Sequence, residues 1–183
     1  MSFDFRRCTV EQLWRHVAAH LEGRGIGVTL VGGSAASIHS RGAYQSGDLD
    51  FVTEDLFARE QVDPAMEELG FLPQGRHFVH PECPHLFVDF VPGPLGIGED
   101  TRIQPMEVRE GDVTIKVLSP TDCVRDRLGG FIHHGTRDQL EQAALVAWAH
   151  PIDWKKVERW ARKEAPTGAE AYAELRRRVA ARG

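Results

Sequence analysis

The stretch that decides the fold is IGVTLVGGSAASIHSRGAYQSGDLDFV, residues 26–52 of a chain of 183. Residues 26–31 form a short apolar run rich in β-branched side chains, which predicts a buried strand. This run ends at Gly32-Gly33-Ser34, where we expect a tight turn into a helix. Residues 49–52 predict a second strand. The order is therefore strand, glycine turn, helix, strand.

Three carboxylates are placed in or beside these strands. Alternate residues of a strand share a face, so Asp48 and Asp50 point to one side while the apolar residues between them face the core. Asp89 lies in the apolar run FVDF, within a later predicted strand. Carboxylates crowded on one face repel, and a buried charge is costly unless it is paired. A hard cation such as Mg²⁺, or Mn²⁺, would satisfy all three.

The glycine turn has a chemical interpretation as well. Gly32 and Gly33 allow the backbone to approach a ligand closely, and the free amides at the start of a helix attract phosphate oxygens. Ser34 adds a hydroxyl group. The stretch therefore predicts a site for a phosphate-bearing ligand and a divalent metal ion.

Working outward, Thr9 and Gln12 predict a capping box for a helix that stops at Gly23. We expect a short helix capped by Asp63-Pro64, a hairpin from residues 76–79 and 86–91, and a last strand over 112–118. Beyond it, helices are predicted over 120–133, 137–149, 154–164 and 168–182. The prediction is an α+β fold, with a mixed sheet and flanking helices in residues 1–118 and an α-helical C-terminal part in residues 119–183.

Gly32-Gly33-Ser34 followed by Asp48-Leu49-Asp50-Phe51 resembles the signature of the nucleotidyltransferase superfamily, and the predicted order of elements matches over roughly residues 8–118. The helices beyond are similar to those of small bacterial members, which include abortive-infection toxins and minimal nucleotidyltransferases. The resemblance implies transfer of a nucleoside monophosphate from an NTP, with ATP as the first candidate, to an acceptor hydroxyl on a protein, an RNA or a small molecule.

The same resemblance assigns roles to residues. Asp48, Asp50 and Asp89 are the implied catalytic and metal-binding residues, with Asp89 also helping to deprotonate the acceptor. Gly32, Gly33 and Ser34 are the implied nucleotide-binding residues. Many members carry a basic residue on the helix after the glycine turn, and Arg41 is the candidate here.

Two alternatives belong to other classes. The scarcity of basic residues beside the glycine turn suits a non-catalytic module that keeps the fold, for example in a toxin–antitoxin pair with a partner protein. The pattern His77-x-x-His80-x-x-Cys83-x-His85 contains four residues that could bind zinc. Its spacing fits no standard zinc finger, and we favour an ordinary hairpin turn.

Composition sets the broad class. The formal net charge is −5, and 42% of residues are hydrophobic, which is typical of a globular protein. No apolar run is long enough to span a bilayer, and the N-terminus has no apolar signal segment. We therefore expect a cytoplasmic protein without membrane contact, in which Cys8, Cys83 and Cys123 are reduced.

Overall fold

The computed structural model describes residues 3–54 and 59–181 of the chain. Within these residues, seven strands form one mixed sheet in the order β3-β4-β5-β2-β1-β7-β6. Their bounds are β1 Val28–Val31, β2 Asp48–Thr53, β3 Leu72–Gln74, β4 His77–His80, β5 Cys83–Pro92, β6 Met106–Glu110 and β7 Val113–Val117.

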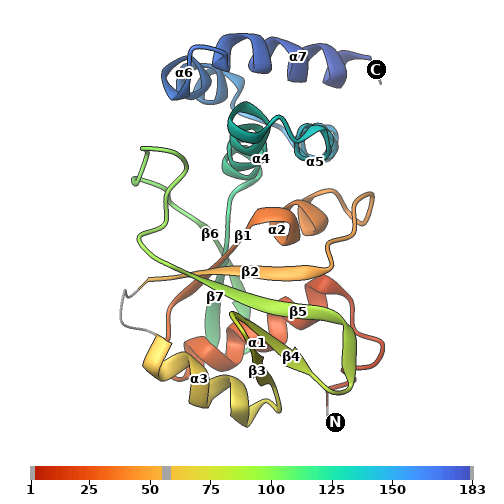
Figure 1. The fold of residues 1–183 in the computed structure, drawn as a ribbon, viewed down its shortest axis with the longest axis vertical. Helices are drawn as coiled ribbons and strands as arrows, with labels where there is room; N and C mark the ends of the chain where they lie inside the picture. Colours follow the sequence, from red (N-terminus) through yellow and green to blue (C-terminus); the bar gives the residue numbers. More distant parts are fainter. Residues whose placement is uncertain (1–2, 55–58, 182–183) are drawn as a thin grey trace.

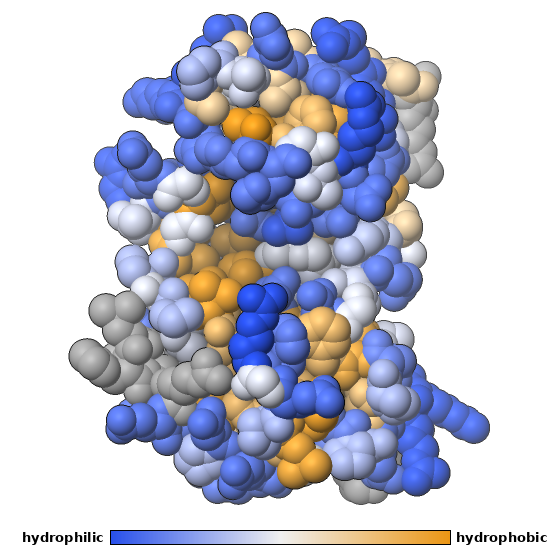
Figure 2. All heavy atoms as spheres, viewed as in Figure 1, coloured by the Kyte–Doolittle hydropathy of each residue, from blue (hydrophilic) through white to orange (hydrophobic). Residues whose placement is uncertain are grey.

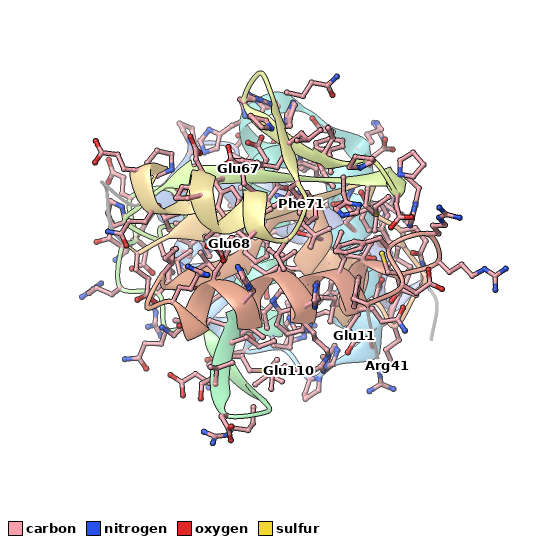
Figure 3. The ribbon with its side chains drawn as sticks, turned by 90° about the horizontal axis from the view of Figure 1, so that it is seen from below. Glu11, Arg41, Glu67, Glu68, Phe71 and Glu110 are labelled. Carbon is pink, nitrogen blue, oxygen red and sulfur yellow. The ribbon has the colours of Figure 1, made fainter. Side chains whose placement is uncertain are left out.

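Helices cover both faces of this sheet (Figure 1). The helices α1 (Val10–Gly23) and α3 (Arg59–Glu68) lie together across one face, which Figure 3 shows from below. On the other face, α2 (Gly32–His39) is followed in space by the C-terminal helices. These are α4 Pro120–His134, α5 Arg137–Ala149, α6 Trp154–Glu164 and α7 Gly168–Ala180. Helix α2 packs against α4 and α5, so it joins the sheet to the C-terminal helices.

The position of β2 in the sheet matters most for the site. It pairs antiparallel with β1 and parallel with β5, and the register sets Asp50 opposite Val31 on one side and Asp89 on the other. The alternate residues Leu49 and Phe51 are fully buried. They pack in the same core as Leu13, Trp14, Val17 and Leu21 of α1. Burying each such side chain contributes about 1.5–3 kcal/mol to the stability of the fold. This energy determines which face of β2 is turned toward the core.

The predicted fold class is confirmed, and the capping box of Thr9 and Gln12 is present at the start of α1. Two edge strands, β3 and β6, escaped prediction because most of their residues are exposed and carry no clear apolar alternation. The prediction that Asp63-Pro64 caps α3 was wrong: Pro64 lies inside the helix, whose earlier turn is held by the buried Val62. The division into residues 1–118 and 119–183 stays a prediction.

Across residues 3–54 and 59–181, none of the helices has both the length and the apolar composition that a bilayer crossing requires.

Candidate active site

The sheet brings the three predicted carboxylates together. Asp48 and Asp50 alternate along β2 and are both half-buried. Asp89 stands beside Asp50 on the neighbouring parallel strand, with its side chain 13% exposed. Residues opposite each other in adjacent strands share a face. The carboxylates of two strands therefore form one acidic cluster at the middle of the sheet.

Neighbouring groups hold two of these side chains in place. The Ser46 hydroxyl donates to Asp48 Oδ1 at 2.7 Å. The backbone amide of Phe90 donates to Asp89 Oδ1 at 3.0 Å. Asp89 Oδ2 lies 3.4 Å from Nδ1 of His77 on β4. Asp89 Oδ2 also lies 3.5 Å from Nε of Arg76. One oxygen of Asp48 and both oxygens of Asp89 therefore have partners in the protein.

The electrostatics single out Asp50. Its pKa is raised to about 6, first by burial and then by the negative charge of Asp48. The carboxylates of Asp89 and Asp126 act in the same direction, whereas the guanidinium of Arg127 lowers the pKa of Asp50. Without a cation the folded protein therefore disfavours the ionised cluster, and a bound cation would relieve the repulsion.

The glycine turn is built against this carboxylate. Gly32 has φ +67°, a conformation that other residues seldom adopt, and a Cβ there would lie 2.5 Å from Asp50 Oδ2. At Gly33 a Cβ would lie 3.1 Å from Ser46 Oγ and 3.2 Å from Tyr44 Oη. Glycine is thus required at position 32 for helix α2 to begin beside the acidic cluster, and Gly33 leaves little room for a larger side chain.

Replacing Gly32 with alanine should destabilise the protein by about 2 kcal/mol or more, because the left-handed conformation costs about 1–2 kcal/mol and the new methyl group displaces Asp50. Urea denaturation measures this loss. Gly23→Ala is the control: Gly23 ends α1, and a Cβ there would meet nothing within 4 Å. If Gly32→Ala unfolds at the same urea concentration as wild type, the account of the turn is wrong.

Two other residues that were predicted to bind nucleotide, Ser34 and Arg41, do not point a free polar group at the acidic cluster. Ser34 is fully buried; its hydroxyl donates to the Val31 carbonyl at 2.8 Å and accepts from the Asp50 amide at 3.2 Å, so it holds strand, turn and strand together. Arg41 lies beyond the C-terminal end of α2, about 12 Å along the helix from Gly33. It is exposed and is labelled in Figure 3. The structure therefore does not bring Arg41 to the acidic cluster.

The cation whose charge lowers the pKa of Asp50 comes from α4, and its side chain is paired with the neighbouring Asp126. Arg127 donates to Asp126 Oδ2 at 2.7 Å and lies 3.4 Å from the side-chain oxygen of Gln142. Its side chain is 15% exposed. Sequence spacing gave no indication of this residue, because α4 is far from β2 along the chain. One usable signal was Gly129-Gly130, since paired glycines inside a helix are unfavourable and indicate close packing or a ligand.

A pocket of about 330 Å³ opens beside Arg127, between α4, α6 and the loop after β5. The loop after β5 contributes Gly96 and Gly98, and the helices contribute mostly polar residues. The pocket's residues are Gly96, Ile97, Gly98, Asp126, Arg127, Gly129, Gly130, His133, His134, Gln139, Trp160 and Glu164. In the space-filling view, hydrophobic residues are exposed at the level between the C-terminal helices and the sheet (Figure 2).

The donor set fits a hard divalent cation. Mg²⁺ and Mn²⁺ prefer carboxylate oxygens, and three carboxylates on one face, one of them with a raised pKa, form a cluster whose charge calls for a cation. The residues that would hold it are Asp48, Asp50 and Asp89.

The four residues of the His77–His85 pattern do not converge, which agrees with the favoured interpretation of an ordinary hairpin turn. His77 faces Asp89, and His80 stacks on Phe5 with ring centroids 3.7 Å apart. Cys83 and His85 are neighbours, and the third member of their group is Cys8.

Aromatic and basic residues of the C-terminal helices contact one another and the loop after β5. Trp160 is buried, and its indole donates to the Ile97 carbonyl at 3.2 Å. The Arg176 guanidinium lies 4.4 Å from the ring centroid of Trp154, and Arg178 forms an ion pair with Glu141.

The fold is that of nucleotidyltransferases. An antigenic nucleotidyltransferase-like protein from Paracoccidioides brasiliensis superposes with a TM-score of 0.56 at 14% identity, over 75% of this chain and 73% of that chain. The antibiotic-resistance factor ANT(2'')-Ia superposes with a TM-score of 0.53 at 17% identity, over 94% and 93%. The lincosamide antibiotic adenylyltransferase LnuA gives 0.52 at 13% identity, over 77% and 98%. No protein-family model and no curated protein sequence matches the chain.

Proposed function

From its nucleotidyltransferase-like fold, we propose that this chain transfers a nucleoside monophosphate from an NTP, ATP being the first candidate, to an acceptor hydroxyl. The observation that carries the proposal is the convergence of Asp48, Asp50 and Asp89 beside the Gly32-Gly33 turn, with Arg127 interacting from α4. The three carboxylates could bind a metal ion, and the positive charge of Arg127 could bind a triphosphate. The repulsion between Asp50 and its neighbouring carboxylates, and the close approach of Gly32 to Asp50, both suit a bound cation and phosphate.

The chemistry follows from these groups. The acceptor oxygen attacks the α-phosphorus of the NTP, the bond from that phosphorus to the β-phosphate oxygen breaks, and pyrophosphate leaves with the electron pair. Asp48, Asp50 and Asp89 would hold divalent ions, which when bound would supply stabilisation of the negative charge that develops in the reaction. Asp89 takes the proton of the acceptor hydroxyl, and Arg127 offsets the negative charge of the triphosphate. The amides at the start of α2 add hydrogen-bond donors for phosphate oxygens.

The pocket beside Arg127 favours a small acceptor over a protein or an RNA. Its volume of about 330 Å³ and its polar lining suit a small molecule with several hydroxyl or amino groups. Two of the similar structures point in the same direction: ANT(2'')-Ia was solved with adenylyl-2''-tobramycin and LnuA with lincomycin. We therefore place the acceptor between α4, α6 and the loop after β5.

The decisive experiment is incubation with radiolabelled NTPs, Mg²⁺ and either host lysate or a panel of hydroxylated small molecules. We expect one class of acceptor to gain the label and Asp48→Ala to abolish the transfer. Absence of label with every NTP and acceptor, together with failure to bind NTP, would favour the non-catalytic module instead.

Metal binding should depend on pH through Asp50. Because its pKa is raised to about 6, the carboxylate is largely protonated below that pH and cannot bind the ion. The increase in Tm caused by Mn²⁺ should be full above about pH 7 and disappear as the pH falls through about 6. Thermal unfolding with and without Mn²⁺ between pH 5 and pH 8 measures it. A Tm increase that is the same at both ends of this range would contradict the assignment of Asp50 as a ligand.

A further inference from the structure

A group of thiol and imidazole side chains lies at the start of β5, apart from the proposed active site. Cys8 immediately precedes α1, and Cys83 and His85 stand at the start of β5. The ligand atoms of the three side chains all lie within 4.8 Å of one another. Both sulfurs are buried, whereas His85 is exposed. From this geometry we infer that Cys8, Cys83 and His85 bind a zinc ion.

The distances match those of a zinc centre. Two thiolates bound at about 2.3 Å to one tetrahedral zinc ion lie about 3.8 Å apart. The sulfurs of Cys8 and Cys83 are 3.7 Å apart. A sulfur and a nitrogen on the same ion lie about 3.6 Å apart, and Cys83 Sγ is 3.9 Å from His85 Nδ1. A disulfide would require the two sulfurs to approach by a further ~1.7 Å.

Cys83 Sγ lies at nearly the same distance from the other ring nitrogen of His85, 4.0 Å from Nε2, and that nitrogen has the hydrogen bond that metal-bound histidines commonly make. Nε2 of His85 lies 3.0 Å from the Cys8 carbonyl oxygen. A carbonyl can only accept, so Nε2 carries the proton and Nδ1 keeps its lone pair for the metal. Metal-binding histidines characteristically donate their other N–H to a carboxylate or a backbone carbonyl. A neutral imidazole and two thiolates also bring a divalent ion to zero net charge.

The burial of the three side chains bears on how an ion would reach them. Because His85 is exposed, an ion can approach the group from solvent, and a water molecule would supply the fourth ligand. The opposite side is closed by the N-terminal segment, where Phe5 stacks on His80 and Arg6 pairs with Glu82 at 2.7 Å. Zinc would therefore join the start of α1 to the start of β5, the strand that carries Asp89. This structural role does not depend on the proposed transferase activity.

The experiment uses the full chain expressed with zinc and purified without chelators. Elemental analysis should find one zinc ion per chain. Replacement by Co²⁺ should produce thiolate-to-cobalt charge-transfer absorption, which carboxylate ligands do not give. His85→Gln, a change at an exposed residue, should weaken zinc binding at least tenfold in a competition titration with a chromophoric chelator. Cys8→Ser should weaken it further and reduce the charge-transfer band.

Two controls locate the ion. Cys123 is buried in α4 outside the group, so Cys123→Ser should leave zinc and the cobalt spectrum unchanged. Asp48→Asn removes an active-site carboxylate and should also retain zinc. If His85→Gln and Cys8→Ser keep the zinc while Asp48→Asn loses it, the inference is overturned. It is equally overturned if wild-type protein takes up no zinc and shows no thiolate–cobalt band, or if Cys8 and Cys83 are recovered as a disulfide.

Discussion

Asp50→Asn should abolish nucleotidyl transfer and, in the same protein, raise the stability of the metal-free fold. The transfer rate should fall on the order of 10³-fold or more, since metal coordination supplies several kcal/mol of transition-state stabilisation. The stability of the metal-free protein should rise by up to about 3 kcal/mol above pH 7, because the pKa of Asp50 is raised from 3.8 to about 6. These opposite effects characterise a residue placed for ligand binding.

The pH dependence fixes the sign of the second effect. A carboxyl group with a raised pKa in the folded state gives its full contribution to stability below pH 4 and loses it as the pH rises through about 6. Asparagine cannot ionise and suffers no such loss. The difference in the free energy of unfolding between Asp50→Asn and wild type should therefore grow between pH 4 and pH 6 and stay constant above pH 6.

Urea unfolding at several pH values in the presence of a chelator measures this gap, and a labelled-NTP assay measures transfer. Asp112→Asn is the matched control, because Asp112 is exposed at the turn between β6 and β7. Asp112→Asn should change neither the free energy of unfolding nor the rate of nucleotidyl transfer. A variant at Asp50 that unfolds more easily than wild type above pH 7 would refute the electrostatic account of the cluster.

The second large effect is expected at Arg127. Arg127→Met keeps the length of the side chain but removes the guanidinium that interacts with Asp50. We expect kcat/KM for the NTP to fall by about 10²-fold, the usual loss when a donor to a charged transition state is removed. The pKa of Asp50 should rise further, because Arg127 is the group that lowers it. The pH midpoint of the Mn²⁺-induced Tm increase should then move upward.

The pH midpoint of the Mn²⁺-induced Tm increase distinguishes an electrostatic role of Arg127 from a merely structural one, because destabilising the fold alone would not shift that midpoint. Arg137→Met is the control: Arg137 opens α5, its side chain is 77% exposed, and its ion pair with Glu174 spans 4.0 Å. Wild-type kcat/KM in Arg127→Met, with an unmoved midpoint, would show that Arg127 takes no part in the site.

Arg127 also bears on the choice between an enzyme and a non-catalytic module. In the sequence, the scarcity of basic residues near Gly32-Gly33-Ser34 favoured the non-catalytic alternative. A cation from another element removes that reason, because α4 supplies what α2 lacks. The proposed transferase therefore accounts for both the carboxylates and the arginine.

The sequence by itself determined the parts that depend on local spacing. Alternation in residues 48–52 set which side chains of β2 face the core and which face the site, because the period of a strand is two. The Gly32-Gly33 turn, the capping box of α1 and the helices α5 and α6 follow from equally local rules. The fold class and the meeting of Asp48 with Asp50 were therefore predictable.

Only the tertiary structure decided which distant residues meet. The register of β2 with β5 placed Asp89 beside Asp50, and packing of α4 against α2 set Arg127 near the cluster while Arg41 stayed at the far end of α2. The segment before α1 packs beside the start of β5, so Cys8 joins Cys83 and His85 instead of the four residues of the hairpin pattern meeting. Such pairings are chosen by burial summed over whole elements, and no short stretch of sequence contains that sum.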